Sequence, residues 1–375
     1  KLDLIVENAR SRHFHNKGRA EQELKSDIEF LYFLDKLFRE VHLLEKLNRP
    51  NLQVILSNMT KELYPILEAV LPDGFGFKSN LEYNLTLATQ HMDSLDTIQN
   101  AKFNKYLNMS IQDDMNSLLI ASEGTRITKF LEAICRYGFT GWISRYWSIG
   151  DLDHSTLFLT RASWNPDITP NEVYRDYICN VYGPQCLPEM LEAFRLLEEN
   201  SAFQSENIFA VGFPYPNLMR GHFEMDTHFS GNSKPRDDLL KCKDNYVRMG
   251  TLAESAFGKS RHNGKSSLKY FIGRLKTCAM FLDTAYIVEK AGIAYRSGQK
   301  AREDSDPFEA ADRIDEASTL LKQSVVLAQK TIEAHIEIVR DESDVGLLAA
   351  MNEYMYKYLK AKSYIVHNES IKWRL

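Results

Sequence analysis

The fold is decided by three consecutive stretches of the chain: Tyr106-Leu-Asn-Met-Ser-Ile111, Arg126-Ile-Thr-Lys-Phe-Leu-Glu-Ala-Ile-Cys-Arg-Tyr137 and Phe139-Thr-Gly-Trp-Ile-Ser144. The first and third are short apolar runs typical of buried strands. The stretch between them has the apolar spacing of an amphipathic helix, and Gly138 is a typical residue to end it. A strand, a helix and a second strand in this order predict a βα unit on a parallel sheet.

The same alternation extends toward the N-terminus. Leu52-Gln-Val-Ile-Leu56 and Phe75-Gly-Phe-Lys78 are two further strand candidates, separated by a predicted helix at residues 60–70. Residues 20–47 form a predicted helix with apolar residues three and four positions apart, which Pro50 ends, and residues 1–18 are an irregular polar segment. We therefore expect about four βα units, within residues 19–150.

The strand pattern stops after Gly150, and residues 151–375 are predicted to form a helical C-terminal domain. The clearest start signal is Thr169, an N-cap residue followed by Pro170 at the first helical position. Helices are expected at residues 151–163, 170–181, 188–199, 236–257, 266–297, 306–340 and 345–366. The predicted fold class is thus α/β plus all-α, with domains at residues 1–18, 19–150 and 151–375.

Composition excludes several classes of protein. Of the 375 residues, 44% are hydrophobic and 26% are charged, which excludes global disorder. The net charge is −5, from 46 basic and 51 acidic residues with no basic stretch, so nucleic acid is not an expected partner. No apolar run approaches the roughly 20 residues of a membrane span.

The sequence also lacks the common cofactor and metal motifs. It contains no G-x-G-x-x-G, P-loop or G-x-S-x-G motif, and none of its five cysteines forms a C-x-x-C pair. We therefore expect no cofactor and no metal. The chain begins with Lys1 instead of Met, so an upstream leader or domain can be missing. The localisation stays open: secreted or periplasmic with such a leader, cytoplasmic without one.

In parallel sheets, reactive groups collect where the strands end, because the following loops converge there. This rule gives a short group of candidates that is rich in carboxylates and aromatic rings. After the second strand come Asn80 and Glu82; after the third Asp113 and Asp114; after the fourth Arg145, Tyr146, Trp147, Asp151, Asp153 and His154.

Carboxylates and aromatic rings are what a sugar site requires, since rings stack on pyranose faces and a carboxylate pair supplies an acid and a base. We expect Asp113 or Asp114 to act as the base or its partner, with Glu82 as a second catalytic candidate. The alternative is that the two aspartates cap the following turn and that Glu82 lies in a solvated loop. The remaining candidates would bind an oligosaccharide or polysaccharide substrate.

A second cluster of possible ligands alternates along His222-Phe-Glu224-Met-Asp226-Thr-His228. Its spacing matches no zinc signature, so we interpret it as a polar loop with solvated histidines and not as a metal site.

The block from Gly138-Phe-Thr-Gly-Trp-Ile-Ser-Arg-Tyr-Trp to His154, continuing through Ala162-Ser-Trp-Asn-Pro166 and on to Gly183, resembles α-glucuronidase-type and related TIM-barrel glycoside hydrolases. The resemblance covers about the last barrel strand and the first helices after it. It implies a partial (β/α)8-type barrel, about its last four units, followed by a helical domain, and exo-cleavage of a terminal or side-chain sugar.

The resemblance also locates the expected machinery. It implies an acid on an earlier strand, upstream of Lys1, and base carboxylates near residues 80–82 and 110–114. The resemblance implies only about half of a barrel in this chain, so a rival hypothesis stays open. In it, the chain is a noncatalytic carbohydrate-binding or interaction subunit whose half-barrel is completed by another chain.

Overall fold

A computed structural model describes residues 17–49, 52, 54–57, 63–64, 67, 75–79, 92–111, 118–145, 153–206, 219–224 and 236–374. The chain forms two compact units. Unit 1 comprises Lys1–Ser110 and Arg126–Arg145, and unit 2 comprises Ile111–Thr125 and Tyr146–Leu375.

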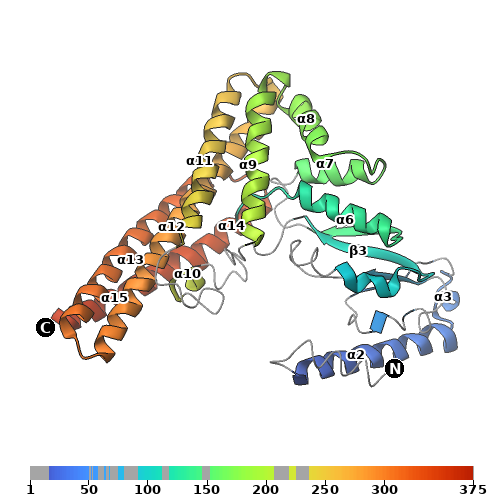
Figure 1. Cartoon of the computed structure of the whole chain (residues 1–375), viewed down its shortest axis with the longest axis horizontal. Coiled ribbons are helices and arrows are strands. Elements are labelled where there is room, and N and C mark those ends of the chain that lie inside the picture. Colours follow the sequence, from blue (N-terminus) through green and yellow to red (C-terminus); the bar gives the residue numbers. More distant parts are fainter. Residues whose placement is uncertain are drawn as a thin grey trace. The chain divides into compact units, whose positions relative to one another are not determined.

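Unit 1 contains a sheet of four parallel strands, β1 (Ile55–Ser57), β2 (Gly76–Ser79), β3 (Asn104–Ser110) and β4 (Gly141–Arg145), in the order β1-β2-β3-β4. Each strand lies beside the next one in the chain, which is the arrangement that consecutive units of a (β/α)8 barrel produce. The predicted fold class, a partial α/β barrel followed by a helical region, is confirmed (Figure 1).

The helices of unit 1 follow from its apolar spacing. Helix α6 (Gly124–Arg136) and the turn after it bury Ile127, Phe130, Ala133 and Tyr137, three or four residues apart. Gly138 has a φ of 62°, a left-handed conformation that favours glycine, so the helix ends where the sequence predicts. The other helical elements are α2 (Lys17–Asp35), η1 (Lys36–Glu40), α3 (Leu43–Lys46) and η3 (Met92–Ile98).

A buried lysine joins β3 to two helix ends of unit 1. Lys105 is only 3% exposed, and its Nζ donates hydrogen bonds to the carbonyl oxygens of Ile98 (3.0 Å), Gln99 (2.6 Å) and Tyr137 (3.0 Å). These carbonyls end η3 and α6, where a cation is favourable because the last carbonyls of a helix lack intrahelical donors. The charge is therefore structural.

Unit 2 is helical throughout most of its described residues. The helices are α7 (Asp153–Ala162), α8 (Pro170–Val181), η6 (Pro184–Cys186), α9 (Leu187–Glu206), α10 (Arg220–Glu224), α11 (Asp237–Phe257), α12 (His262–Glu303), α13 (Pro307–Ile336), α14 (Glu342–Ala350), η8 (Met351–Lys357) and α15 (Tyr358–Arg374). Helix α8 has its predicted bounds. Thr169 Oγ1 accepts from the Glu172 backbone N–H, and Glu172 Oε2 accepts from the Thr169 N–H at 2.8 Å, which completes a capping box.

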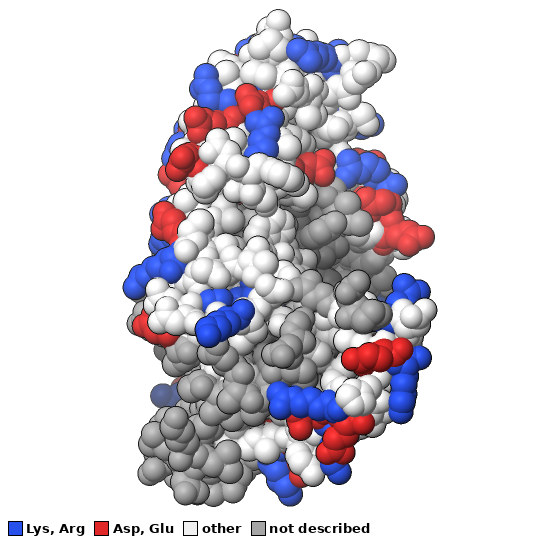
Figure 2. Space-filling view, turned by 90° about the vertical axis from the view of Figure 1, so that its right-hand side faces the viewer, with Lys and Arg blue, Asp and Glu red and all other residues white. Residues whose placement is uncertain are grey.

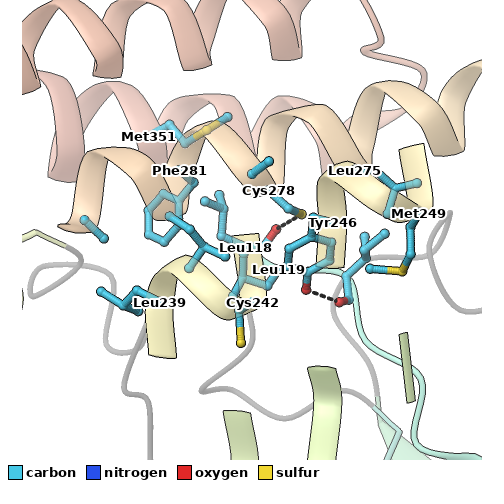
Figure 3. Packing of buried hydrophobic residues seen from close by; sticks show 14 of the residues in the cluster. Leu118, Leu119, Leu239, Cys242, Tyr246, Met249, Leu275, Cys278, Phe281 and Met351 are labelled. Atoms are coloured by element: carbon cyan, nitrogen blue, oxygen red, sulfur yellow. Dashed lines mark hydrogen bonds between the residues drawn. The ribbon is translucent and has the colours of Figure 1, made fainter. Parts of the chain in front are cut away.

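The core of unit 2 lies among its long helices, with α12 packed against α11 and α13. The non-helical segment that follows β3 in the chain enters this core. Leu118 and Leu119, each 1% exposed, lie among side chains of α11 and α12 that include Tyr246 and Cys278 (Figure 3). A segment that the sequence connects to a strand is thus buried in the helical unit.

The described surface carries charges of both signs. Figure 2 shows basic and acidic side chains interspersed over the face in view, without a broad area of one sign among the described residues. Ion pairs such as Arg195 with Glu192 (2.7 Å) and Lys243 with Asp283 (2.8 Å) account for part of this pattern. Among the described helices, none is long and apolar enough to span a membrane.

Candidate functional site

Most of the predicted site residues fall outside the described part of the chain. This group consists of Asn80, Glu82, Asp113, Asp114, Tyr146, Trp147 and Asp151. Arg145 is the last residue of β4, and Asp153 and His154 are the first two residues of α7. The proposed roles of all ten residues stay predictions.

The sheet register nevertheless fixes where two of the loops begin. Ser110, the last residue of β3, pairs with Arg145, the last residue of β4. The two loops that carry Asp113 and Tyr146 therefore leave the sheet from neighbouring strand ends. This is the edge at which parallel α/β sheets gather reactive groups.

Residues 118–125 belong to unit 2 and are held by its helices. The Leu118 carbonyl oxygen accepts a hydrogen bond from Nη2 of the buried Arg274 (3.0 Å), and the Ile120 carbonyl oxygen accepts one from Tyr246 Oη (2.7 Å). Ser122 N–H donates to Ser201 Oγ at 2.8 Å. Backbone groups in a nonhelical segment can be buried only when they find such partners.

The strongest attachment of this loop is a carboxylate from α9. Glu198 Oε1 accepts from Ser122 Oγ (2.8 Å), from the Gly124 backbone N–H (2.7 Å) and from Tyr174 Oη (2.6 Å), and Oε2 accepts from the Thr125 N–H (3.2 Å). Because Gly124 and Thr125 begin α6, Glu198 caps this helix through space, where a negative charge is favourable. With four hydrogen-bond donors around it, the Glu198 carboxylate anchors this segment.

Gly124 makes this close approach possible. A Cβ at that position would lie 2.8 Å from Glu198 Oε1 and 2.8 Å from Pro170 Cβ, and it would also collide with the Tyr174 hydroxyl. Any other residue would push α6 away from its cap.

Glu123 is a candidate that the sequence reasoning missed. It lies in the loop after β3, directly before α6, and it is 1% exposed. Burial and the negative charge of Glu198 raise the pKa of Tyr174 well above its usual value, and the charge of Glu123 raises it further. A carboxylate buried this deeply after a parallel strand is a candidate acid or base, and the available signal was its position between the predicted third strand and the helix predicted from Arg126.

His154 occupies an aromatic cluster in unit 2. It is 4% exposed, its ring stacks on Phe194 with centroids 4.7 Å apart, and Tyr174 meets it edge-on at 5.4 Å. Burial lowers the pKa of His154 to about 4, so the ring is neutral at pH 7. Its Nε2 has no hydrogen-bond partner among the described residues.

The prediction that His222 belongs to a solvated loop was wrong. His222 lies in α10 at 1% exposure, with Nδ1 2.8 Å from Glu289 Oε1, and Arg236 Nε donates to the same oxygen at 2.9 Å. Burial alone would raise the pKa of Glu289, but the hydrogen bonds from His222 and Arg236 outweigh it and lower the pKa to about 2.

The physical reason for this correction is that an ionised Glu289 compensates the buried polar groups. Glu224 pairs with Arg220 at 2.7 Å, whereas Asp226 and His228 lie outside the described residues. Within the described chain, no group of three or more His, Cys, Asp or Glu side chains is arranged to hold a metal ion.

Comparison with protein-family models gave no match. A search of curated proteins likewise gave none. Among solved structures, the chain is similar to a GH138 enzyme targeting pectin rhamnogalacturonan II, with a TM-score of 0.56 and 11% sequence identity. The match covers 88% of this chain and 58% of that one, so this chain spans less than two thirds of the length of the matched enzyme. At this identity the likeness shows the fold alone, in which a parallel α/β part precedes a helical region.

Proposed function

We propose that this chain belongs to an exo-acting glycoside hydrolase, which removes a terminal or side-chain sugar from an oligosaccharide or polysaccharide. The observation that carries the proposal is the fold likeness to a carbohydrate-degrading enzyme over 88% of the chain. Folds do not dictate activity, so the candidate residues have to supply the chemistry. The finer expectation from the sequence, α-glucuronidase-type cleavage, is part of the same proposal.

The proposed mechanism uses carboxylates at the carboxyl edge of the parallel sheet. Asp113 or Asp114 serves as the base or its partner, Glu82 is the second candidate, and Glu123 joins them because of its burial in the same loop as the two aspartates. One carboxyl group must be protonated to donate to the leaving oxygen, and the other must be ionised. Arg145, Tyr146, Trp147, Asp151, Asp153, His154 and Asn80 are the proposed sugar-binding residues.

The unit 2 contacts support a role for the helical unit in this mechanism. Arg274, Tyr246 and Glu198 hold the end of the loop in which the proposed base lies. Catalysis depends on preorganised groups, and this anchoring supports the proposal that the helical unit takes part.

The test uses the native polypeptide and a panel of pectic oligosaccharides, rhamnogalacturonan II and glucuronate-decorated oligosaccharides, with released sugars separated by chromatography. We expect release of a monosaccharide, and a drop in kcat/KM of about 10²–10⁴-fold in the Asp113→Asn/Asp114→Asn variant and in Glu123→Gln if that residue takes part. Asp312→Asn, an exposed residue of α13, is the matched control. Unchanged turnover in the double variant and in Glu123→Gln would eliminate the assignment.

A noncatalytic carbohydrate-binding subunit is the second candidate. The observation that favours it is Trp164, which is 90% exposed in the turn between α7 and α8 and offers an uncovered ring for stacking. Saturable oligosaccharide binding without any product after prolonged incubation would support this candidate over the hydrolase.

A further inference from the structure

Helices α8 and α9 of unit 2 line an open pocket of about 420 Å³. This volume lies within the range of about 300–1,000 Å³ that small-molecule sites occupy. Its apolar lining residues are Pro170, Pro188 and Leu191. Its polar lining residues are Thr125, Asn171, Tyr174, Glu192, Arg195 and Glu198.

The polar part offers neutral donors and acceptors. The Thr125 hydroxyl and the Asn171 amide are exposed side chains near the N-termini of α6 and α8, and neither has a side-chain partner among the described residues. Glu198 Oε2 accepts only the long bond from the Thr125 N–H (3.2 Å), so it has room for a second donor. A hydroxyl-bearing ligand can bond to all three groups.

The charges of the pocket select against an anion. Arg195, the cation among the described residues that line it, donates through Nε (2.7 Å) and Nη2 (2.9 Å) to Glu192 and through Nη1 to Glu199. Arg248 also pairs with Glu192, at 2.8 Å. Among the lining residues, the carboxylates of Glu192 and Glu198 outnumber the guanidinium group of Arg195, so the lining carries one formal negative charge. The charge of Arg195 is already shared by the carboxylates of Glu192 and Glu199, so an incoming carboxylate would meet net repulsion.

We infer that this pocket is a binding site for a neutral pyranose residue, and that it excludes uronic acids. The apolar lining residues suit the C–H groups of a sugar ring, and the hydroxyl, amide and carboxylate groups suit its hydroxyls. The choice of a sugar rests on the proposed function. The site adds a specificity for neutral sugar units that lies on the helical unit and does not depend on Asp113, Asp114 or Glu82.

The experiment is a ligand-observed NMR titration of the whole protein, made catalytically silent by Asp113→Asn/Asp114→Asn. The probes are methyl glucoside, galactoside, xyloside and rhamnoside, with glucuronic and galacturonic acid as anionic counterparts. We expect at least one neutral glycoside to bind about tenfold or more tightly than both acids. Adding Thr125→Ala and Asn171→Ala together should weaken that binding about tenfold or more.

The matched control is the pair Thr251→Ala and Asn180→Ala. Thr251 lines a different groove, between α11 and α12, and Asn180 is an exposed residue of α8 outside the pocket. Binding that is lost only in the pocket variant supports the inference. It is overturned if no neutral glycoside binds, if an acid binds equally well, or if control and pocket variants lose binding alike.

Activity separates this inference from the proposed function. Hydrolysis by the unmodified protein without pocket binding overturns the inference and leaves the hydrolase proposal intact. Pocket binding without hydrolysis supports the inference and overturns the hydrolase proposal.

Discussion

Removing the Glu198 carboxylate tests whether the helical unit holds the loop after β3. In Glu198→Ala, four groups lose the carboxylate: Ser122 Oγ, Tyr174 Oη and the backbone N–H groups of Gly124 and Thr125, at 2.6–3.2 Å. Ser122 Oγ and Tyr174 Oη lie 2.9 Å apart, so one of these two can still donate to the other. Ser122 and Tyr174 are 1% and 4% exposed, so water cannot easily replace the carboxylate for them.

The magnitude follows from these contacts. Hydrogen bonds to a charged group contribute about 1.5–3 kcal/mol each, and a buried donor left without a partner costs about 1–3 kcal/mol. The four bonds share one carboxylate and are not additive, and Thr125 can reach solvent. We therefore expect the free energy of unfolding to fall by about 3–5 kcal/mol, a large part of the roughly 5–15 kcal/mol of a typical domain.

The assay is urea unfolding followed by far-UV circular dichroism, which reports on the helices of unit 2. With a slope of about 1–3 kcal/mol per molar urea, the midpoint should fall by about 1–5 M. Hydrogen exchange should also rise across residues 118–125, because their anchor is lost.

The control is the next residue, Glu199, whose carboxylate pairs with Arg195 at the surface and is 53% exposed. An exposed ion pair contributes about 0–1 kcal/mol, so Glu199→Ala should change stability by no more than that. If Glu198→Ala is no more destabilising than Glu199→Ala, and exchange across residues 118–125 is unchanged, the anchoring role is refuted.

Two further outcomes are expected. Lys105→Met should lower the free energy of unfolding by about 3–5 kcal/mol in urea denaturation, because three carbonyls lose a buried cation. The control Lys129→Met, on the exposed side of α6, should have almost no effect. Equal effects of the two substitutions would contradict the capping role of Lys105. The lowered pKa of His154 predicts that the protein loses stability in acid. Its pKa is about 4 in the folded protein and 6.5 as the ordinary value, so the unfolded chain binds the proton first as the pH falls; stability should decline from about pH 6.5 to 4, by up to about 3 kcal/mol, and level off below. Between pH 7 and pH 4.5, the free energy of unfolding should decline less in His154→Phe than in the unmodified protein. An identical decline in the two proteins would disprove that His154 causes the loss of stability.

The parallel sheet, the bounds of α8 and the end of α6 could be predicted because their causes are local, whereas the helices expected at residues 20–47 and 345–366 are each divided into three elements. Apolar runs of strand length separated by amphipathic stretches specify βα units, and Thr169, Pro170 and Gly138 mark helix ends through hydrogen bonds and backbone angles within a few residues. The predicted fold class is correct for this reason.

The prediction that His222 lies in a solvated loop was wrong because the cause of its burial is not local. Its sequence neighbours are polar, which is typical of a solvated loop, but its partner Glu289 lies 67 residues later, on α12. Such a pairing over distance leaves no periodic signal in the chain.

The sequence by itself determined that strand-rich and helical parts follow one another and that carboxylates and aromatic residues come after the strands. Only the tertiary structure decided that Leu118–Thr125 packs with the helices, since its apolar residues would fit any core. The pairing of Glu198 with α6, and the burial of Glu123 beside it, are set by contacts more than seventy residues apart. Local patterns specify elements because hydrogen bonds and side-chain periodicity act over a few residues, whereas a site is assembled by packing between distant segments.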